Sequence, residues 1–171
     1  MRTDKVVVED YNPYWHDEYI KIKKELEDLL LPEIITIEHV GSTSVEGLSA
    51  KAIIDLDIVI KDYTNFETVK NKLFQAGYFY EGDLGIKDKH AFKYSNKPHL
   101  MRHYLYVCPE YSEELKRHIA FRDYLRSNGK DRDWYGISKK LIAKYYPFDI
   151  ESYMKAKAPI VAEIQKRVFQ Y

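Results

Sequence analysis

Two aspartates stand two positions apart inside an apolar run, in the segment IIDLDIVI at residues 53–60. Because side chains alternate across a β-strand, Asp55 and Asp57 are predicted to project from one face, with Cα atoms about 6–7 Å apart. Paired carboxylates repel each other and are costly to bury, so they indicate either a solvated strand or a cation that neutralises them. The apolar residues on both faces favour a buried strand and therefore the cation. Oxygen ligands of this kind suit Mg²⁺ or Mn²⁺, which complete their shells with water and substrate phosphates.

A glycine and two hydroxyl residues stand where the preceding apolar run ends, in Gly41-Ser42-Thr43. Glycine permits a tight turn and a close approach of the backbone, so that amide N–H groups and the two hydroxyls can hold an anion. An ordinary loop has the same composition, so the tripeptide alone is a weak signal. Ser42 precedes Asp55 by 13 positions, and together the two segments indicate phosphates bound beside a divalent metal.

Three basic residues are candidate contacts for those phosphates. Lys157 falls in the middle of an apolar stripe on the last predicted helix, where a lysine either snorkels to solvent or points into an anion site. Arg122 lies among apolar residues of its own predicted helix, and its guanidinium suits either bidentate phosphate binding or a buried pairing with a carboxylate. Lys51 directly precedes the aspartate strand, where an exposed lysine would also be ordinary. We predict that all three contact the anion.

Capping residues and helical periodicity predict five helices, in residues 11–33, 62–77, 111–129, 131–147 and 149–171. Asn12 is the predicted N-cap of the first helix. Thr64 and Glu67 form a predicted capping box for the second, which Gly77 ends. Ser112 is the predicted start of the third.

The helices are expected to bury apolar stripes, and the last contains Pro159, which should kink it or lie near a break. The predicted stripes comprise Trp15, Tyr19, Ile22, Leu26 and Leu29 in the first helix, Trp134, Ile137, Leu141, Ile142 and Tyr145 in the fourth, and Ile150, Tyr153, Ile160, Val161, Ile164 and Val168 in the last.

Four β-branched or aromatic segments predict strands, in residues 33–40, 51–60, 90–95 and 102–108. Residues 81–90, with two glycines and mixed charges, are predicted to form a mobile loop. The order of elements predicts one α+β domain with a mixed sheet and a C-terminal helical layer over it.

Composition limits the possible functions. Lys plus Arg and Asp plus Glu each total 27, so the chain lacks the overall positive field that broad nucleic-acid binding needs. No apolar stretch is long enough for a membrane span or a signal peptide, so we expect a cytoplasmic protein. Cys108 is the one cysteine, and its place in an apolar strand favours a buried thiol over a nucleophile.

The segment IEHVGSTSVEGLSAKAIIDLDIVI at residues 37–60 resembles the signature of the DNA polymerase β-like nucleotidyltransferase superfamily, and in particular its GrpB family. HIAFRDYLRSN at 118–128 and ESYMKAKAPIV at 151–161 are similar to further segments of that family. The resemblance covers nearly the whole chain. It implies a single nucleotidyltransferase-like domain over residues 1–171, with a mixed sheet, an N-terminal helix and a C-terminal helical layer.

The chain also departs from the family pattern. Glu46 stands where family members often carry Pro, and Tyr104-Leu105-Tyr106-Val107 stands where they often carry His-Leu-His-Val. Active members of the superfamily usually place a third carboxylate on a later strand, and residues 102–107 contain none. Glu38 is a possible substitute from the first strand. His39, beside it, is either a phosphate contact or a structural residue.

Together these features predict a nucleotidyltransferase. Asp55 and Asp57 would hold Mg²⁺ or Mn²⁺, which would orient a nucleoside triphosphate for attack by the hydroxyl of an unknown acceptor. Gly41, Ser42 and Thr43, with the three basic residues, would bind the phosphates. The alternative is a non-catalytic nucleotide or anion binder that retains the fold, which the missing third carboxylate favours. No membrane partner is expected, and the oligomeric state is left open.

Overall fold

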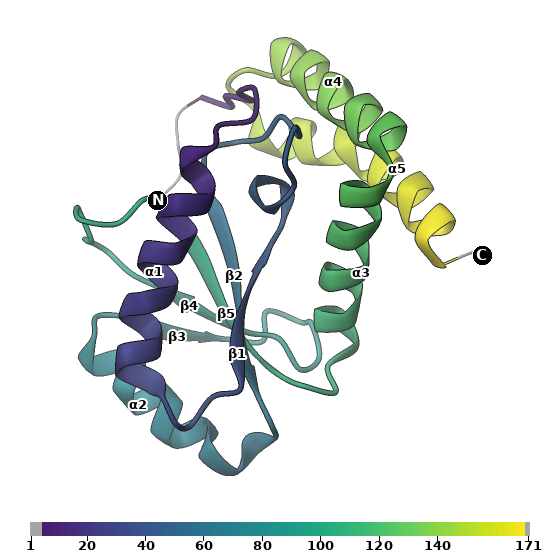
Figure 1. The fold of residues 1–171 in the computed structure, drawn as a ribbon. Coiled ribbons are helices and arrows are strands. Elements are labelled where there is room, and N and C mark those ends of the chain that lie inside the picture. The colour runs from purple at the N-terminus through teal and green to yellow at the C-terminus, as the bar shows by residue number, and fades with distance from the viewer. Residues whose placement is uncertain (1–4, 170–171) are drawn as a thin grey trace.

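In the computed structural model, which describes residues 5–169, the described strands form one mixed sheet in the order β1-β2-β5-β4-β3 (Figure 1). Their bounds are β1 Thr36–Val40, β2 Ile54–Ile60, β3 Phe79–Gly82, β4 His90–Lys93 and β5 His103–Pro109. β2 pairs in parallel with β5, and the other neighbours are antiparallel. The predicted mixed sheet is confirmed. The short strand β3 was not predicted, and residues 83–89 form the turn between it and β4.

The central strand β2 is buried from both sides, and its alternating side chains separate two layers. Ile54, Leu56, Ile58 and Ile60 project toward the main core. Asp55 and Asp57 project from the opposite face, as the period of a strand requires. The layer above the second face therefore decides the environment of the carboxylates.

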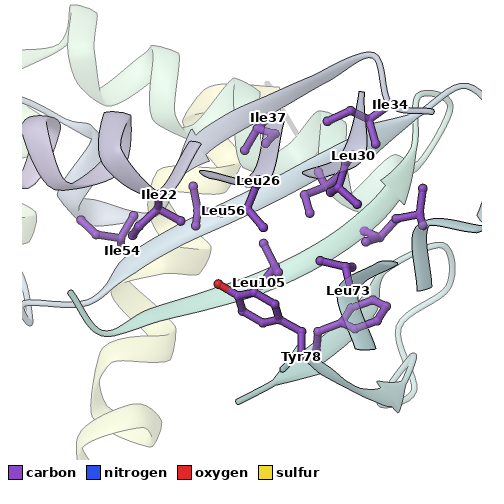
Figure 2. Packing of buried hydrophobic residues seen from close by; sticks show 14 of the residues in the cluster. Ile22, Leu26, Leu30, Ile34, Ile37, Ile54, Leu56, Leu73, Tyr78 and Leu105 are labelled. Carbon is purple, nitrogen blue, oxygen red and sulfur yellow. The ribbon is translucent and has the colours of Figure 1, made fainter. Parts of the chain in front are cut away.

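Helices α1 (Tyr14–Leu30) and α2 (Phe66–Gln75) cover the apolar face of the sheet. Figure 2 shows Leu26 of α1 above Leu56 and Leu105 of neighbouring strands. Each such fully buried aliphatic side chain contributes roughly 1.5–3 kcal/mol of burial free energy. The predicted stripe of α1 is confirmed except at its end, where Leu30 rather than Leu29 is fully buried.

The C-terminal helices are α3 (Glu113–Ser127), α4 (Gly129–Tyr145) and α5 (Ile150–Phe169). α3 contacts β1, and α4 and α5 pack on each other and on α3 (Figure 1). A second small core joins Val45 and Leu48, from the segment after β1, to Leu125, Tyr135 and Ile164 of these helices. The C-terminal helices therefore hold the segment that leads from β1 to β2.

The predicted apolar stripe of α4 is wrong. Ile137 and Leu141 are 61% and 52% exposed, whereas Tyr135, Lys139 and Ala143 face inward. Gly136 is also buried on this inward face, where it packs against Leu48 and Ser49. The buried face of α4 is therefore the one that meets the segment after β1, and it includes a lysine and a glycine rather than the most apolar residues.

Local capping was predicted correctly at some helix ends and wrongly at one. The hydroxyl of Ser112 accepts a hydrogen bond from the Leu115 N–H at 3.2 Å, as predicted. The predicted capping box of Thr64 and Glu67 is absent. Thr64 lies in a 3₁₀ helix (η2, Tyr63–Asn65) that Asp62 caps, and α2 begins directly after η2, at Phe66.

Three further expectations concern where helices begin, end or break. Gly77, with φ +88°, follows the end of α2 as predicted. Asn12 accepts a hydrogen bond from the Tyr14 N–H at 3.0 Å, and α1 begins there. Pro159 lies inside α5, which continues to Phe169 without a break.

Within the described part of the chain, no helix is both long and apolar enough to cross a membrane.

Candidate functional site

A cavity of about 240 Å³ opens where β2 begins. Its walls come from the turn after β1, the start of β2, the strand β5, and the helices α4 and α5. Ser42, Thr43, Lys51, Asp55 and Lys157 all line it, so the tertiary structure brings together five of the residues that the sequence analysis selected.

Gly41 holds the turn after β1 against Asp55. Its φ is +72°, and a Cβ at this position would lie 2.2 Å from Asp55 Oδ2. Only glycine satisfies both conditions without a shift of the carboxylate. Ser44 donates its hydroxyl to the Gly41 carbonyl, and Arg126 donates two N–H groups to the Ser44 carbonyl at 3.0 and 2.7 Å. The turn is therefore braced from α3.

The hydroxyl of Thr43 is used within the protein. It donates to the Ile53 carbonyl at 3.3 Å and contacts His39 Nε2 at 3.0 Å. His39 is buried and stacks on Tyr19, with ring centroids 4.5 Å apart. Burial, with nearby positive charges, lowers the pKa of His39 to about 3, so its imidazole is neutral. These contacts are those of a structural residue that fixes the turn.

Three lysines approach the cavity from different elements: Lys51 before β2, Lys139 on α4 and Lys157 on α5. Burial and repulsion from Lys51 lower the pKa of Lys157 to about 8, although Asp55 opposes the shift. Burial also lowers the pKa of Lys51. The cavity thus concentrates ammonium groups that a polyanion would stabilise.

Lys139 was not selected from the sequence. It is 2% exposed and donates to Ser42 Oγ at 2.7 Å, and its ammonium lies 4.2 Å from the ring centroid of Tyr135. Burial, followed by repulsion from Lys157 and Lys51, lowers its pKa well below the usual value. The sequence signal was the spacing of Tyr135 and Lys139 by four, which puts both on one helix face.

Asp55 is the carboxylate that faces the lysines. Burial and repulsion from Asp57 raise its pKa to about 6, and the nearby cations His118, Lys157 and Lys51 partly offset that rise. Asp55 is therefore mostly ionised at neutral pH, and the cavity combines one carboxylate with three lysines.

Asp57 has a different neighbour. It is completely buried, and its Oδ2 lies 2.6 Å from His118 Nδ1, while Nε2 of the same ring lies 3.2 Å from Glu114 Oε1. Burial disfavours the charged imidazole, but the hydrogen bond and the charge of Asp57 outweigh it and raise the pKa of His118. Asp57 Oδ1 has no hydrogen-bond partner within residues 5–169. His118 therefore neutralises the second aspartate, a role that the sequence analysis did not assign.

Arg122 does not line the cavity. Its Nη1 donates to Glu38 Oε2 at 2.7 Å and to the His39 carbonyl at 3.0 Å, and its Nε donates to Asp123 at 2.9 Å. This is the carboxylate pairing that the sequence left open. Glu38 pairs in register with Asp57 across β1 and β2, so its carboxylate is occupied beside the aspartates. Arg122 and Glu38 therefore link α3 to β1 beside the site and do not form part of the cavity wall.

A metal held by the protein alone has too few ligands here. Among residues 5–169, no group of three His, Cys, Asp or Glu side chains is arranged to hold a metal ion. A divalent ion at Asp55 and Asp57 would need ligands from another molecule, and phosphate oxygens are suitable.

The same arrangement of sheet, turn and helices occurs in known proteins. Residues 5–167 match the family described as GrpB protein. The chain belongs to the GrpB family. A UPF0157 protein of Halalkalibacterium halodurans is 34% identical over 160 residues, which cover 92% of this chain and 80% of that protein. The glutamate-rich protein GrpB of Alkalihalophilus pseudofirmus is 31% identical over 94% of each chain.

Solved structures share this fold, both within the GrpB family and outside it. The crystal structure of the conserved protein GrpB from Enterococcus faecalis superposes with a TM-score of 0.84 and 29% identity, over 96% of this chain and 98% of that one. The Cid1 poly(U) polymerase bound to MgATP superposes with a TM-score of 0.56 and 12% identity. That match covers 81% of this chain but 44% of the Cid1 chain. The likeness to Cid1 shows a nucleotidyltransferase-like fold, which the sequence resemblance predicted.

Proposed function

We propose that this chain binds a nucleoside triphosphate, with its phosphates in the cavity between Gly41, Asp55 and the three lysines. The single observation that carries the proposal is the convergence of Lys51, Lys139 and Lys157 on one cavity beside an ionised aspartate. Burying three ammonium groups near one another is unfavourable unless an anion joins them. A triphosphate supplies several negative charges in a short chain.

The fold supports a nucleotide over an unrelated polyanion. Solved Cid1 structures contain a UTP analogue, MgATP and MgGTP. Their sheet and helices superpose on this chain, although at 12–14% identity. Ser42 lines the cavity and Gly41 directly precedes it, so this turn would approach the phosphates closely. The proposal also implies a cytoplasmic location, since nucleoside triphosphates are abundant there.

The carboxylates fit Mg²⁺ or Mn²⁺ that arrives with the nucleotide. Asp55 lines the cavity, so it is the first ligand that the metal would meet. Asp57 does not line the cavity, but its buried Oδ1 has no hydrogen-bond partner within residues 5–169 and lies on the same strand face, so it is available as a second ligand. Magnesium is commonly held by one or two carboxylates together with substrate phosphates. When bound, the metal would neutralise charge on the phosphates. Asp55 and Asp57 would hold it, and the lysines would hold the remaining phosphate oxygens.

Two functions share this binding step. In nucleotidyl transfer, an acceptor hydroxyl would attack the α-phosphorus while the bond to the β-phosphate oxygen breaks, and the lysines would stabilise the departing pyrophosphate. The paired aspartates of β2 favour this reaction, and its acceptor is unknown. Nucleotide binding without transfer is favoured by the Arg122–Glu38 ion pair, which occupies the carboxylate that lies in register with Asp57.

The binding proposal is tested with one lysine and a neighbour on the same helix. Lys157→Met retains the aliphatic stem but removes the ammonium, so it should weaken binding of MgATP by about 10- to 100-fold, the value of a charge-assisted hydrogen bond. Lys155→Met is the control, because Lys155 is exposed on α5 and lines no part of this cavity. Isothermal titration calorimetry measures both. Equal losses in the two variants, or none in either, would contradict the proposed site.

The same titrations with chelator in place of Mg²⁺ should show weaker binding, and Asp55→Asn should reduce that difference. Release of pyrophosphate from the nucleotide, measured with Mg²⁺ and candidate acceptors, separates transfer from binding alone.

A further inference from the structure

The phosphate cavity is too small for a whole nucleotide. Its volume of about 240 Å³ lies below the roughly 300–1,000 Å³ of typical small-molecule pockets. A nucleoside triphosphate whose phosphates lie among the lysines must therefore extend beyond it. The nucleoside must then lie on an adjoining surface.

A second cavity, of about 470 Å³, adjoins the first across one residue, Tyr104. Tyr104 pairs in register with Asp55 across β2 and β5, so both side chains project from the same face of the sheet. It is 40% exposed, and its hydroxyl accepts a hydrogen bond from Arg102 Nη2 at 3.2 Å. Tyr104 thus separates the two cavities and is held in place by a neighbour.

The second cavity has the lining that a flat heterocycle requires. Phe92 and Leu100 are buried apolar residues in its wall. The ring of Tyr94 stacks on His103 with centroids 4.5 Å apart, and its hydroxyl accepts a hydrogen bond from the His103 N–H at 3.0 Å. Asn96 adds an amide that can donate and accept. The lining also includes the charged residues Glu81, Lys93, Lys97 and Arg102. Apolar and aromatic walls combined with polar groups are typical of sites that bind planar ligands.

We propose that the second cavity holds the nucleobase of the nucleoside triphosphate whose phosphates occupy the first, with the ribose beside Tyr104. The inference rests on the proposed function and adds to it the place of the base. The polar groups near the rim, including Lys93 and Glu81 at 4.0 Å from each other, would contact the edge of the base.

The test compares a nucleotide with inorganic tripolyphosphate, which has the charge but no base. Ser95 is exposed and lines the second cavity, so Ser95→Trp should fill it without disturbing the core. Ser127→Trp is the control, at an exposed residue at the end of α3 that lines neither cavity. Titrations use ATP, UTP and tripolyphosphate with Mg²⁺, and thermal unfolding verifies that each variant is folded.

Ser95→Trp is expected to weaken the binding of ATP or UTP by tenfold or more and to leave the affinity for tripolyphosphate unchanged. Ser127→Trp should change none of these affinities. Unchanged nucleotide affinity in a folded Ser95→Trp protein would overturn the inference and would favour the acceptor as the occupant of the second cavity. Absence of binding by both nucleotide and tripolyphosphate in the wild type would overturn the proposed function itself.

Tyr104 supplies an independent test on the wall between the cavities. Tyr104→Ala should weaken the binding of a nucleotide and leave the binding of tripolyphosphate unchanged. Tyr104→Phe, which retains the ring, should preserve nucleotide binding. Equal losses for nucleotide and tripolyphosphate in Tyr104→Ala would contradict a role in placing the nucleoside.

Discussion

At the scale of single residues, the two aspartates of β2 differ because different groups face them. Asp55 faces a cavity with lysines, whereas Asp57 is completely buried against His118. Two like charges on one strand face are thus accommodated by two separate sets of cations. The arrangement leaves Asp55 as the carboxylate that an incoming ligand would meet.

Asp55→Asn should stabilise the protein at pH 7. The pKa of Asp55 is raised to about 6 in the folded state, above its unfolded value of about 4. Its carboxyl therefore costs stability progressively from about pH 4 to about pH 6, and in full above that range. One pKa unit corresponds to about 1.4 kcal/mol, and with partial exposure taken into account we expect a gain of about 1–3 kcal/mol at pH 7. The gain should shrink as the pH falls below about 6 and disappear below about pH 4, where the carboxyl is protonated in both the folded and the unfolded state.

Urea unfolding at several pH values measures this difference. Asp28→Asn, at an exposed site on α1, should change the free energy of unfolding little at any of them. A loss of stability in Asp55→Asn at pH 7 would show that the carboxylate makes structural hydrogen bonds instead.

At the scale of elements, the turn after β1 is the part whose backbone shape the site needs most. It is built from Gly41 and the 3₁₀ helix Ser42–Ser44, and it is held by Arg126 of α3 and by His39 of β1. Because Asp55 lies directly against Gly41, the turn and the start of β2 form one unit.

Gly41→Ala should be more damaging than an alanine at an open glycine that also has a positive φ. Gly85 has φ +84° and nothing within 4 Å of an added Cβ, so Gly85→Ala measures backbone strain alone, about 1–2 kcal/mol. Gly41→Ala adds a clash with Asp55, and we expect a total of about 2–5 kcal/mol together with loss of MgATP binding. Unfolding free energies and nucleotide titrations measure the two effects.

A double-mutant cycle identifies the source of the extra cost. Asp55→Ala removes the atoms that the new Cβ would meet, so it should partly rescue Gly41→Ala. Additive effects of the two substitutions would show that the carboxylate is not the obstacle.

At the scale of the whole molecule, the neutral composition conceals a local excess of positive charge. Lys plus Arg equals Asp plus Glu over the chain, but the cavity contains three lysines and one aspartate. Such an arrangement favours a small polyanion at one place over broad contact with nucleic acid. Burial lowers the pKa values of the three lysines, so binding of an anion beside them should reverse those shifts.

Nucleotide affinity should therefore fall as the pH rises from 7 to 9. Lys157 has a pKa of about 8 in the free protein, and a phosphate beside it would raise that value, so binding above pH 8 requires uptake of a proton. The affinity should decrease by at most about tenfold per pH unit for each such lysine. Calorimetry in two buffers of different ionisation enthalpy measures the proton uptake. Lys157→Met should flatten the profile, and an equally steep profile in that variant would exclude Lys157 as its source.

Local sequence patterns determined much of the fold and part of the site. The period of two placed Asp55 and Asp57 on one face, and β-branched runs identified β1 and β2. The glycine after β1 indicated a special turn. Such features depend on neighbouring residues in the chain, so they are readable without knowledge of the packing.

Tertiary structure decided which distant side chains meet. His118 reaches Asp57 across 61 residues, Arg122 reaches Glu38 across 84, and Lys139 reaches Ser42 across 97. Helical periodicity limits the faces a helix can bury, but α4 buries Tyr135 and Lys139 and leaves Ile137 exposed. Which cation neutralises which carboxylate therefore depends on how α3, α4 and α5 pack over the sheet and its turn, because charge pairing requires contact within a few ångströms and the sequence alone contains no distances.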